Sequence, residues 1–143
     1  MFFFEKDRRL HMKGFFFGFL IVFISSHAWG QQNAISMFAD TGAEDVALGD
    51  AQLTTYSANA LRGSGAAANK LGVHFLVARG DRKMAEYWFR ISAEDGNASG
   101  EFNYGSMILA DSSENKARAV FWLEKSASEG NEYAQRELKR IAQ

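Results

Sequence analysis

The stretch AEYWFRISAEDGNASGEFNYG, residues 85–105, opens a pattern that returns in AVFWLEKSASEGNEYAQREL, residues 119–138. Six residues recur at one constant offset without a gap: Ala85, Trp88, Ser92, Ala93, Gly96 and Asn97 match Ala119, Trp122, Ser126, Ala127, Gly130 and Asn131. Self-similarity at a period of about 20–50 residues is the sequence signature of repeat architectures. The stretch therefore predicts a chain built from repeated units.

The segment before each tryptophan also recurs at a constant offset. Ala67, Leu71, Gly72 and Phe75 match Gly100, Tyr104, Gly105 and Ile108, and a third, partial copy continues with Ala134, Leu138 and Ile141. Positions spaced by four residues lie on one face of a helix. Proline is absent, and no strict apolar–polar alternation follows Gln31. The fold class expected is therefore all-α.

Two glycines lie in the middle of these expected helices. Glycine there costs about 0.8–1 kcal/mol relative to alanine, so Gly72 and Gly105 indicate places where a bulky neighbour comes close. The aromatic side chains of the next helix are the candidates, and Trp88 and Trp122 are interpreted as core residues. Because segments 81–95 and 119–123 are apolar around more than one stripe, these helices are expected to be contacted from several sides.

Turn residues separate the expected helices. Gly96-Asn97 and Gly130-Asn131 each place a glycine that tolerates positive φ after one helix and an asparagine that can cap the next. Gly80-Asp81 does the same inside the first pair, and 111–113 supplies that turn in the second. The unit expected is helix, turn, helix, turn.

This order of residues resembles the Sel1-like repeat, a relative of the tetratricopeptide repeat. The resemblance is carried by Leu71, Gly72, Gly80, Asp81, Ala85, Trp88, Ala93, Gly96 and Asn97, and again by Tyr104, Gly105, Ala119, Trp122, Ala127, Gly130 and Asn131. It implies an α-solenoid of antiparallel helix pairs over residues 53–143, with two full repeats and capping helices. A degenerate second helix precedes them, with Thr55 in the place of the tryptophan.

The sequence departs from the family pattern in two respects. The Tyr and Gly usual late in the first helix are Phe75 and Ala78 in one copy, and Ile108 and Asp111 in the other. Cysteine, which staples some exported members, is absent. Stability must therefore come from stacking of the helices.

Residues 1–30 read as a secretory signal peptide. Basic residues precede the apolar run GFFFGFLIVFI, residues 14–24, and small residues follow it, with cleavage expected after Ala28 or Gly30. Translation from Met12 would also give a complete signal, and a retained membrane anchor is the alternative, although a spanning helix needs about 20 apolar residues. Residues 31–52 form an acidic flank or cap. The expected location is periplasmic or secreted, with no membrane span after cleavage.

The composition of the chain argues against several classes of function. From Gln31 onward, 12 Lys and Arg stand against 15 Asp and Glu, which gives no basic patch for nucleic acid. There is no cysteine, and His74 is the one histidine after the signal, so Cys–His pairs and multi-histidine metal sites are excluded. No phosphate-loop or nucleophile-elbow motif occurs. We expect no enzyme activity, no catalytic residue, no cofactor and no metal, and His74 partly exposed; an envelope hydrolase is the contrasting hypothesis.

Partner-binding positions are expected where the copies differ. Along the first helices, one column changes chemistry from copy to copy: Asn69, Val73, Phe102, Ser106, Arg136 and Arg140, with Phe102 as the anchor. The resemblance implies that this face binds a protein, and a toxin neutralised by an immunity protein, an envelope sensor and an envelope assembly are the candidates. A structural or regulatory adaptor that multimerises by end-to-end stacking is the alternative.

Overall fold

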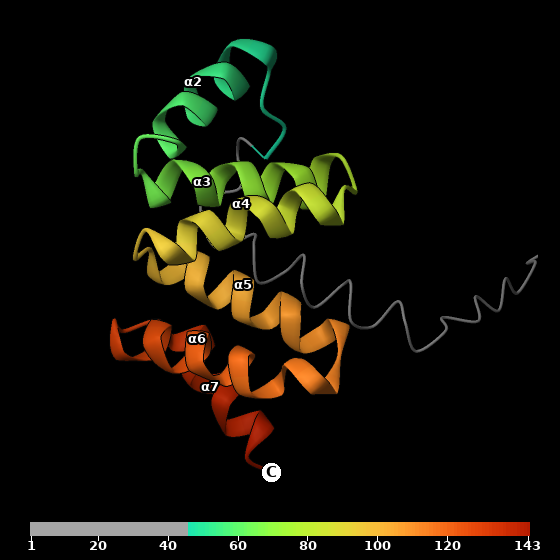
Figure 1. The fold of residues 1–143 in the computed structure, drawn as a ribbon, viewed down its shortest axis with the longest axis vertical. Coiled ribbons are helices and arrows are strands. Elements are labelled where there is room, and N and C mark those ends of the chain that lie inside the picture. The colour runs from blue at the N-terminus through green and yellow to red at the C-terminus, as the bar shows by residue number, and fades with distance from the viewer. Residues whose placement is uncertain (1–45) are drawn as a thin grey trace, which may run out of the picture.

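The computed structural model of the protein describes residues 46–143, so the expected signal peptide and residues 31–45 of the acidic flank lie outside the described residues. Within the described part the chain forms six α-helices and no strand, which confirms the all-α prediction (Figure 1). The helices are α2 (Asp50–Ala60), α3 (Gly65–Val73), α4 (Arg82–Glu94), α5 (Ala98–Asp111), α6 (Lys116–Ser128) and α7 (Glu132–Ile141). A π-helical turn, His74–Ala78, extends α3, and a 3₁₀ turn, Ser113–Asn115, precedes α6.

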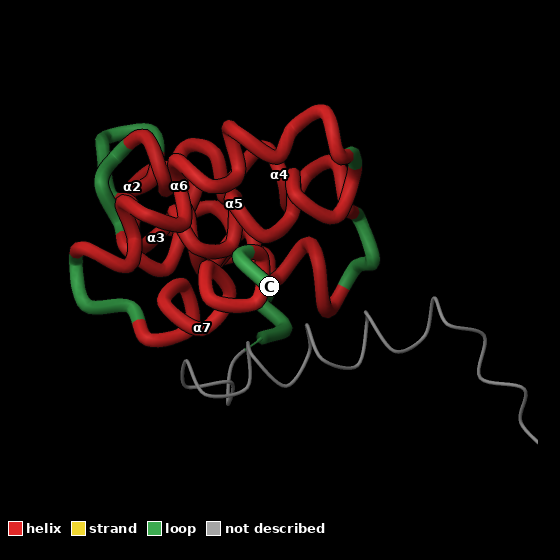
Figure 2. Tube along the Cα trace, turned by 90° about the horizontal axis from the view of Figure 1, so that it is seen from below, coloured by secondary structure: helices red, strands yellow, loops and turns green. Residues whose placement is uncertain are grey.

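Each helix packs against the next along the chain, and α3 also contacts α5. The helices therefore stack in chain order from α2 at one end to α7 at the other (Figure 1). Viewed from the α7 end, α4 and α6 lie toward one side of the stack and α3 and α7 toward the other (Figure 2). We call the surface of α3, α5 and α7 the odd-helix face and that of α4 and α6 the even-helix face.

The Gly-Asn turns act as the sequence predicts. Gly96 and Gly130 have φ of 75° and 91°, the left-handed region that glycine enters without strain. Asn97 Oδ1 accepts the Gly100 N–H at 2.9 Å, and Asn131 Oδ1 accepts those of Tyr133 and Ala134 at 3.0 and 3.2 Å. Each asparagine thus satisfies N–H groups that the first turn of a helix leaves unpaired.

Both mid-helix glycines face residues of the next helix, and at Gly72 the neighbour is one of the aromatic candidates. A Cβ on Gly72 would lie 2.4 Å from the ring of Phe89, so the phenylalanine and not Trp88 occupies that space. At Gly105 the nearest atoms belong to Ala119, Leu123 and Trp122, at 3.1–3.2 Å. Trp88 is buried at 6% exposure, whereas Trp122 is only partly buried.

The recurring serine links the two helices within each pair. Ser92 Oγ donates to the carbonyl of Gly65, and Ser126 Oγ donates to the carbonyl of Ala98, both at 2.6 Å. Both serines are fully buried. Their recurrence therefore has a physical reason, because each ties a second helix to the start of the first helix in its own pair.

The second helix pair is joined by a turn that starts later than expected. Asp111 belongs to α5, and the connection runs from Ser112 to Asn115, with Ser112 Oγ accepting the Glu114 N–H at 3.0 Å. Arg82 of α4 pairs with the Asp111 carboxylate and donates to the Met107 carbonyl at 3.1 Å. These bonds explain why α5 continues through Asp111.

The chain contacts the helical core before Leu53. Leu48 is 6% exposed and packs with Ala60, Leu71 and Trp88, so the chain already joins the core close to the start of the described part. A helix is present at this place, α2, which begins at Asp50 and carries an exposed Thr55.

His74 is not partly exposed as expected. It is 2% exposed, and its Nδ1 lies 3.0 Å from the Leu48 nitrogen and 3.1 Å from the Val46 oxygen. The π-helical turn that begins at His74 places this ring against the entering chain, so His74 anchors the segment before α2.

Candidate functional site

The structure separates the six residues of the expected binding column into two groups. Val73 is 8% exposed and Phe102 4%, and both belong to the core; Ser106 has a buried Oγ. The expectation of an exposed Phe102 anchor is wrong, because Leu123 and Ala134 pack around this side chain. Asn69, Arg136 and Arg140 remain at least partly accessible.

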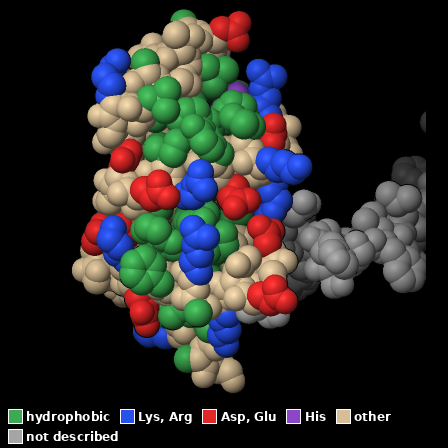
Figure 3. Space-filling view, viewed as in Figure 1, with side chains coloured by type: hydrophobic (Ala, Val, Ile, Leu, Met, Phe, Trp, Pro, Cys, Tyr) green, Lys and Arg blue, Asp and Glu red, His purple; other side chains and the backbone are tan. Residues whose placement is uncertain are grey.

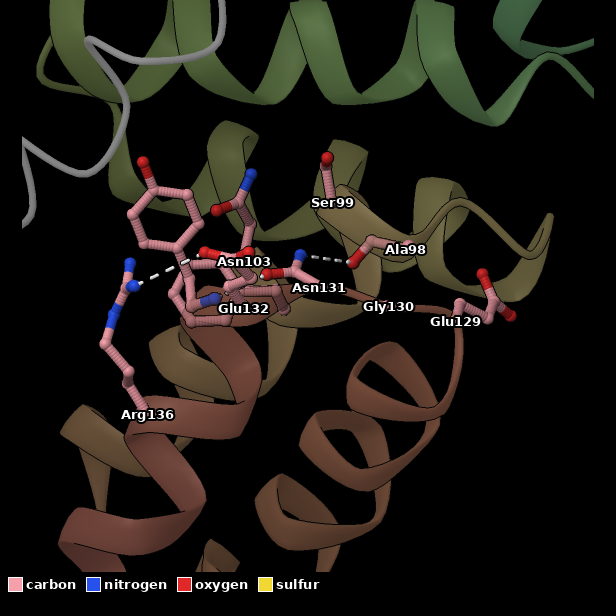
Figure 4. Close-up of a pocket in the computed structure, with 10 residues that line it drawn as sticks. Ala98, Ser99, Asn103, Glu129, Gly130, Asn131, Glu132 and Arg136 are labelled. Carbon is pink, nitrogen blue, oxygen red and sulfur yellow. Dashed lines mark hydrogen bonds and ion pairs between the residues drawn. The ribbon is translucent and has the colours of Figure 1, made fainter.

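A pocket of about 540 Å³ lies where α5 meets α7. Its walls come from the first turns of α5, the turn that leads into α7, and the beginning of α7 (Figure 4). The lining includes Ser99, Phe102, Asn103, Asn131, Tyr133 and Arg136. Two residues of the expected column, Phe102 and Arg136, therefore meet at one site, and the first of them contributes from the wall and not as an exposed anchor.

The repeat turn shapes this pocket. Asn131 caps α7 with its Oδ1 and donates from Nδ2 to the Ala98 carbonyl at 3.3 Å (Figure 4). The same carbonyl accepts the Ser126 hydroxyl. Two residues of the repeated motif thereby fix the start of α5 against the start of α7, and the space between the two starts is the pocket.

One wall of the pocket is aromatic. The rings of Phe102 and Tyr133 lie 5.9 Å apart at 36°, and the Arg136 guanidinium lies 4.6 Å from the Tyr133 ring centre. Arg136 also approaches Glu132 at 3.7 Å. The guanidinium thus makes a cation–π contact with the outer ring of this wall.

A pair of amide side chains reaches the pocket from the odd-helix face. Asn103 is 5% exposed, and its Nδ2 donates to Asn69 Oδ1 at 2.8 Å, which joins α5 to α3. Asn103 lines the pocket, so the pair extends the site from α7 toward α3. Asn103 Oδ1 and Asn69 Nδ2 make no hydrogen bond with the described part of the chain, which leaves an acceptor atom and a donor atom for a ligand.

An ion pair between a buried glutamate and a partly exposed lysine lies next to the pocket. Glu101 of α5 is fully buried and pairs with Lys125 of α6, and its second oxygen has no hydrogen-bond partner within residues 46–143. Lys125 also approaches Glu129 on the pocket wall at 3.9 Å. Glu101 occupies the repeat position of the buried Ala68, and a carboxylate in place of an alanine was the available sequence signal for this pair.

The even-helix face exposes aromatic side chains. From the sequence, the helices that carry them were expected to be contacted by other helices on several sides. Tyr87 is 40% exposed and Phe121 55%, and each ring meets its neighbouring tryptophan edge to face. Figure 3 shows two groups of hydrophobic side chains on this face with charged side chains between them. The recurrence of an aromatic before each tryptophan was the sequence signal for this feature.

Over residues 46–143, no cluster of His, Cys, Asp and Glu has the size needed to hold a metal ion. No helix in the same range is both long and apolar enough to cross a membrane. Comparisons of the chain with protein-family models, curated proteins and solved structures find no match.

Proposed function

We propose that the protein is an exported Sel1-like α-solenoid that binds a partner protein through its odd-helix face, with the pocket between α5 and α7 as the contact centre. The observation that carries this proposal is the convergence of Phe102, Asn103 and Arg136 on one cavity. Aromatic residues and arginine are the types most enriched in contact centres.

The repeated bonds support the solenoid. Ser92 and Ser126 make the same bond in successive helix pairs, and Gly96 and Gly130 adopt the same backbone conformation. Each unit contacts its neighbours in chain order, as expected of a stack of repeats.

The end of the stack favours a binding module over an end-to-end multimer. The side of α7 away from the core carries polar residues, namely Glu132, Gln135, Arg136, Lys139 and Arg140, all of which are exposed. A polar outer face is what a terminal capping helix needs for solubility. A multimer joined through this end would have to bury several charges, which is costly.

Site-directed photo-crosslinking in the native host tests the proposal. A benzophenone amino acid at Ser99 or Arg136, both on the pocket wall, should give a discrete adduct with one envelope or secreted protein. The matched control is the same probe at Lys83, an exposed position on α4. Equal labelling from all three positions, or adducts from the even-helix face alone, would contradict the proposal.

The identity of the captured protein then separates the two versions of the function. A secreted toxin whose activity falls on binding supports an immunity protein, and a sensor or assembly component supports an adaptor. Fractionation of the host cells tests export, because recovery of the chain in the cytoplasm alone would remove both versions.

A further inference from the structure

The pocket has a chemistry that indicates what kind of segment it would bind. We propose that it takes an extended, uncharged segment of a partner protein, whose backbone bonds the Asn69–Asn103 pair and whose apolar side chain packs on Phe102 and Tyr133. This inference rests on the proposed function and adds the ligand class and the means of recognition.

The first argument is the hydrogen-bonding capacity of the two asparagines. Because Asn103 Nδ2 donates in the 2.8 Å bond to Asn69 Oδ1, the two amide atoms that make no hydrogen bond within residues 46–143 are Asn103 Oδ1, an acceptor, and Asn69 Nδ2, a donor. A peptide backbone offers the complementary N–H and C=O in every residue except proline, which lacks the N–H. The bond between the two side chains also holds both amides in place before a ligand arrives, which lowers the entropic cost of binding.

The second argument is charge. The charged side chains that line the pocket are Glu129, Glu132 and Arg136, and each has a counter-charge in reach. Glu132 lies 3.7 Å from Arg136, and Glu129 lies 3.9 Å from Lys125. Because each charge on the wall lies beside one of opposite sign, the wall carries no excess charge that would attract a charged ligand, so we expect a segment without charge at the contact.

The third argument is the apolar wall. Phe102 and Tyr133 present two tilted rings beside Asn103, and the Arg136 guanidinium contacts the outer ring. In an extended segment successive side chains point to opposite sides, so a residue that bonds the asparagines places its side chain, or that of its neighbour, against these rings. The expected ligand is therefore apolar at one position and tolerant of sequence where only its backbone is bound.

The experiment selects short linear peptides from a random displayed library against the full chain and measures their affinity by fluorescence anisotropy. The recovered peptides should be uncharged at their central positions and carry at least one large apolar residue. Methylation of one backbone nitrogen at the contact should weaken binding about tenfold, the effect of losing a hydrogen bond and leaving its partner unpaired.

Variants locate the contact. Asn69→Ala and Asn103→Ala should each weaken binding about tenfold and should abolish the effect of backbone methylation. Asn69 is the safer variant because it is only partly buried, and Asn59→Ala, an asparagine of similar burial on α2, is the matched control. Circular dichroism of each variant checks that the helices are retained.

Three results would overturn the inference: recovery of acidic or basic peptides, a flat methylation scan, or equal affinity for Asn69→Ala, Asn103→Ala and Asn59→Ala. Tighter binding of a synthetic peptide of residues 31–45 than of any selected peptide would also overturn it, because the chain's own segment would then be the ligand. If one of these results is obtained while probes at Ser99 and Arg136 still crosslink to a partner protein, only this inference fails and the proposed function stands. If the crosslinks are also absent, the inference and the proposed function both fail.

Discussion

The contact between Gly72 and Phe89 gives the most direct test of the fold. A Cβ at position 72 would lie 2.4 Å from both Cδ1 and Cε1 of Phe89, a ring with no exposed surface. Overpacking a core typically costs about 1–3 kcal/mol, and the rigid, buried ring places Gly72→Ala near the upper end. Removing a glycine from a helix returns about 1 kcal/mol. The net loss expected is about 2 kcal/mol.

Thermal unfolding followed by circular dichroism measures this loss. A domain of this size loses about 4–8 °C of melting temperature per kcal/mol, so Gly72→Ala should melt about 8–16 °C below the parent chain. Gly105→Ala is the matched control, because its new Cβ would meet its nearest neighbours at 3.1 Å, where a small shift suffices. Its stability should stay within about 1 kcal/mol of the parent.

A double-mutant cycle then assigns the effect to the ring. Phe89→Leu removes part of the volume that Gly72 accommodates, so Gly72→Ala combined with Phe89→Leu should be more stable than the sum of the single losses by about 1 kcal/mol or more. Additive losses, or a Gly72→Ala chain as stable as the parent, would refute the reasoning that the glycine exists to admit the ring.

Three further predictions concern the buried polar groups. Lys125→Ala leaves the buried Glu101 without its cation and should cost up to about 3 kcal/mol in urea unfolding, part of which Glu101→Gln should restore; no recovery would mean that Lys125 acts through packing alone. Ser92→Ala and Ser126→Ala should each cost about 1 kcal/mol, and clearly different losses would argue against equivalent repeats. Burial raises the pKa of Tyr104, so the neutral phenol favours the folded state, and this stability should be lost as pH rises above about 10. Tyr104→Phe should flatten that fall in melting temperature, and an unchanged profile would contradict it.

The elements that sequence could predict are those with local causes. The turns at Gly96 and Gly130 follow from the positive φ that glycine allows, and the starts of α5 and α7 follow from the capping chemistry of asparagine. These effects act within a few residues, so a single copy of the motif is enough to predict the turn and the helix start. The second copy leads to the same prediction independently.

Features that depend on distant partners could not be predicted in the same way. The helical phase indicated that something large faces Gly72, but it did not distinguish Phe89 from Trp88, which are adjacent in sequence. His74 was expected to be partly exposed because nothing in the sequence shows that the segment at Val46 and Leu48 returns to cover it.

The expectation of an exposed Phe102 was wrong for a reason that the structure shows. Variation between copies has two causes, contact with a partner and adaptation to the end of the stack, and Phe102 varies because it packs under the terminal helix, against Ala134. The Asn69–Asn103 pair was missed because the alignment of the copies does not place the two asparagines at the same position. Asn69 and Asn103 are identical residues, but the alignment of the first helices pairs Asn69 with Phe102, the residue before Asn103, and so hides the match. A polar residue that recurs next to the aligned register, on a face that is otherwise apolar, is therefore a better guide to a shared site than a column chosen because it varies.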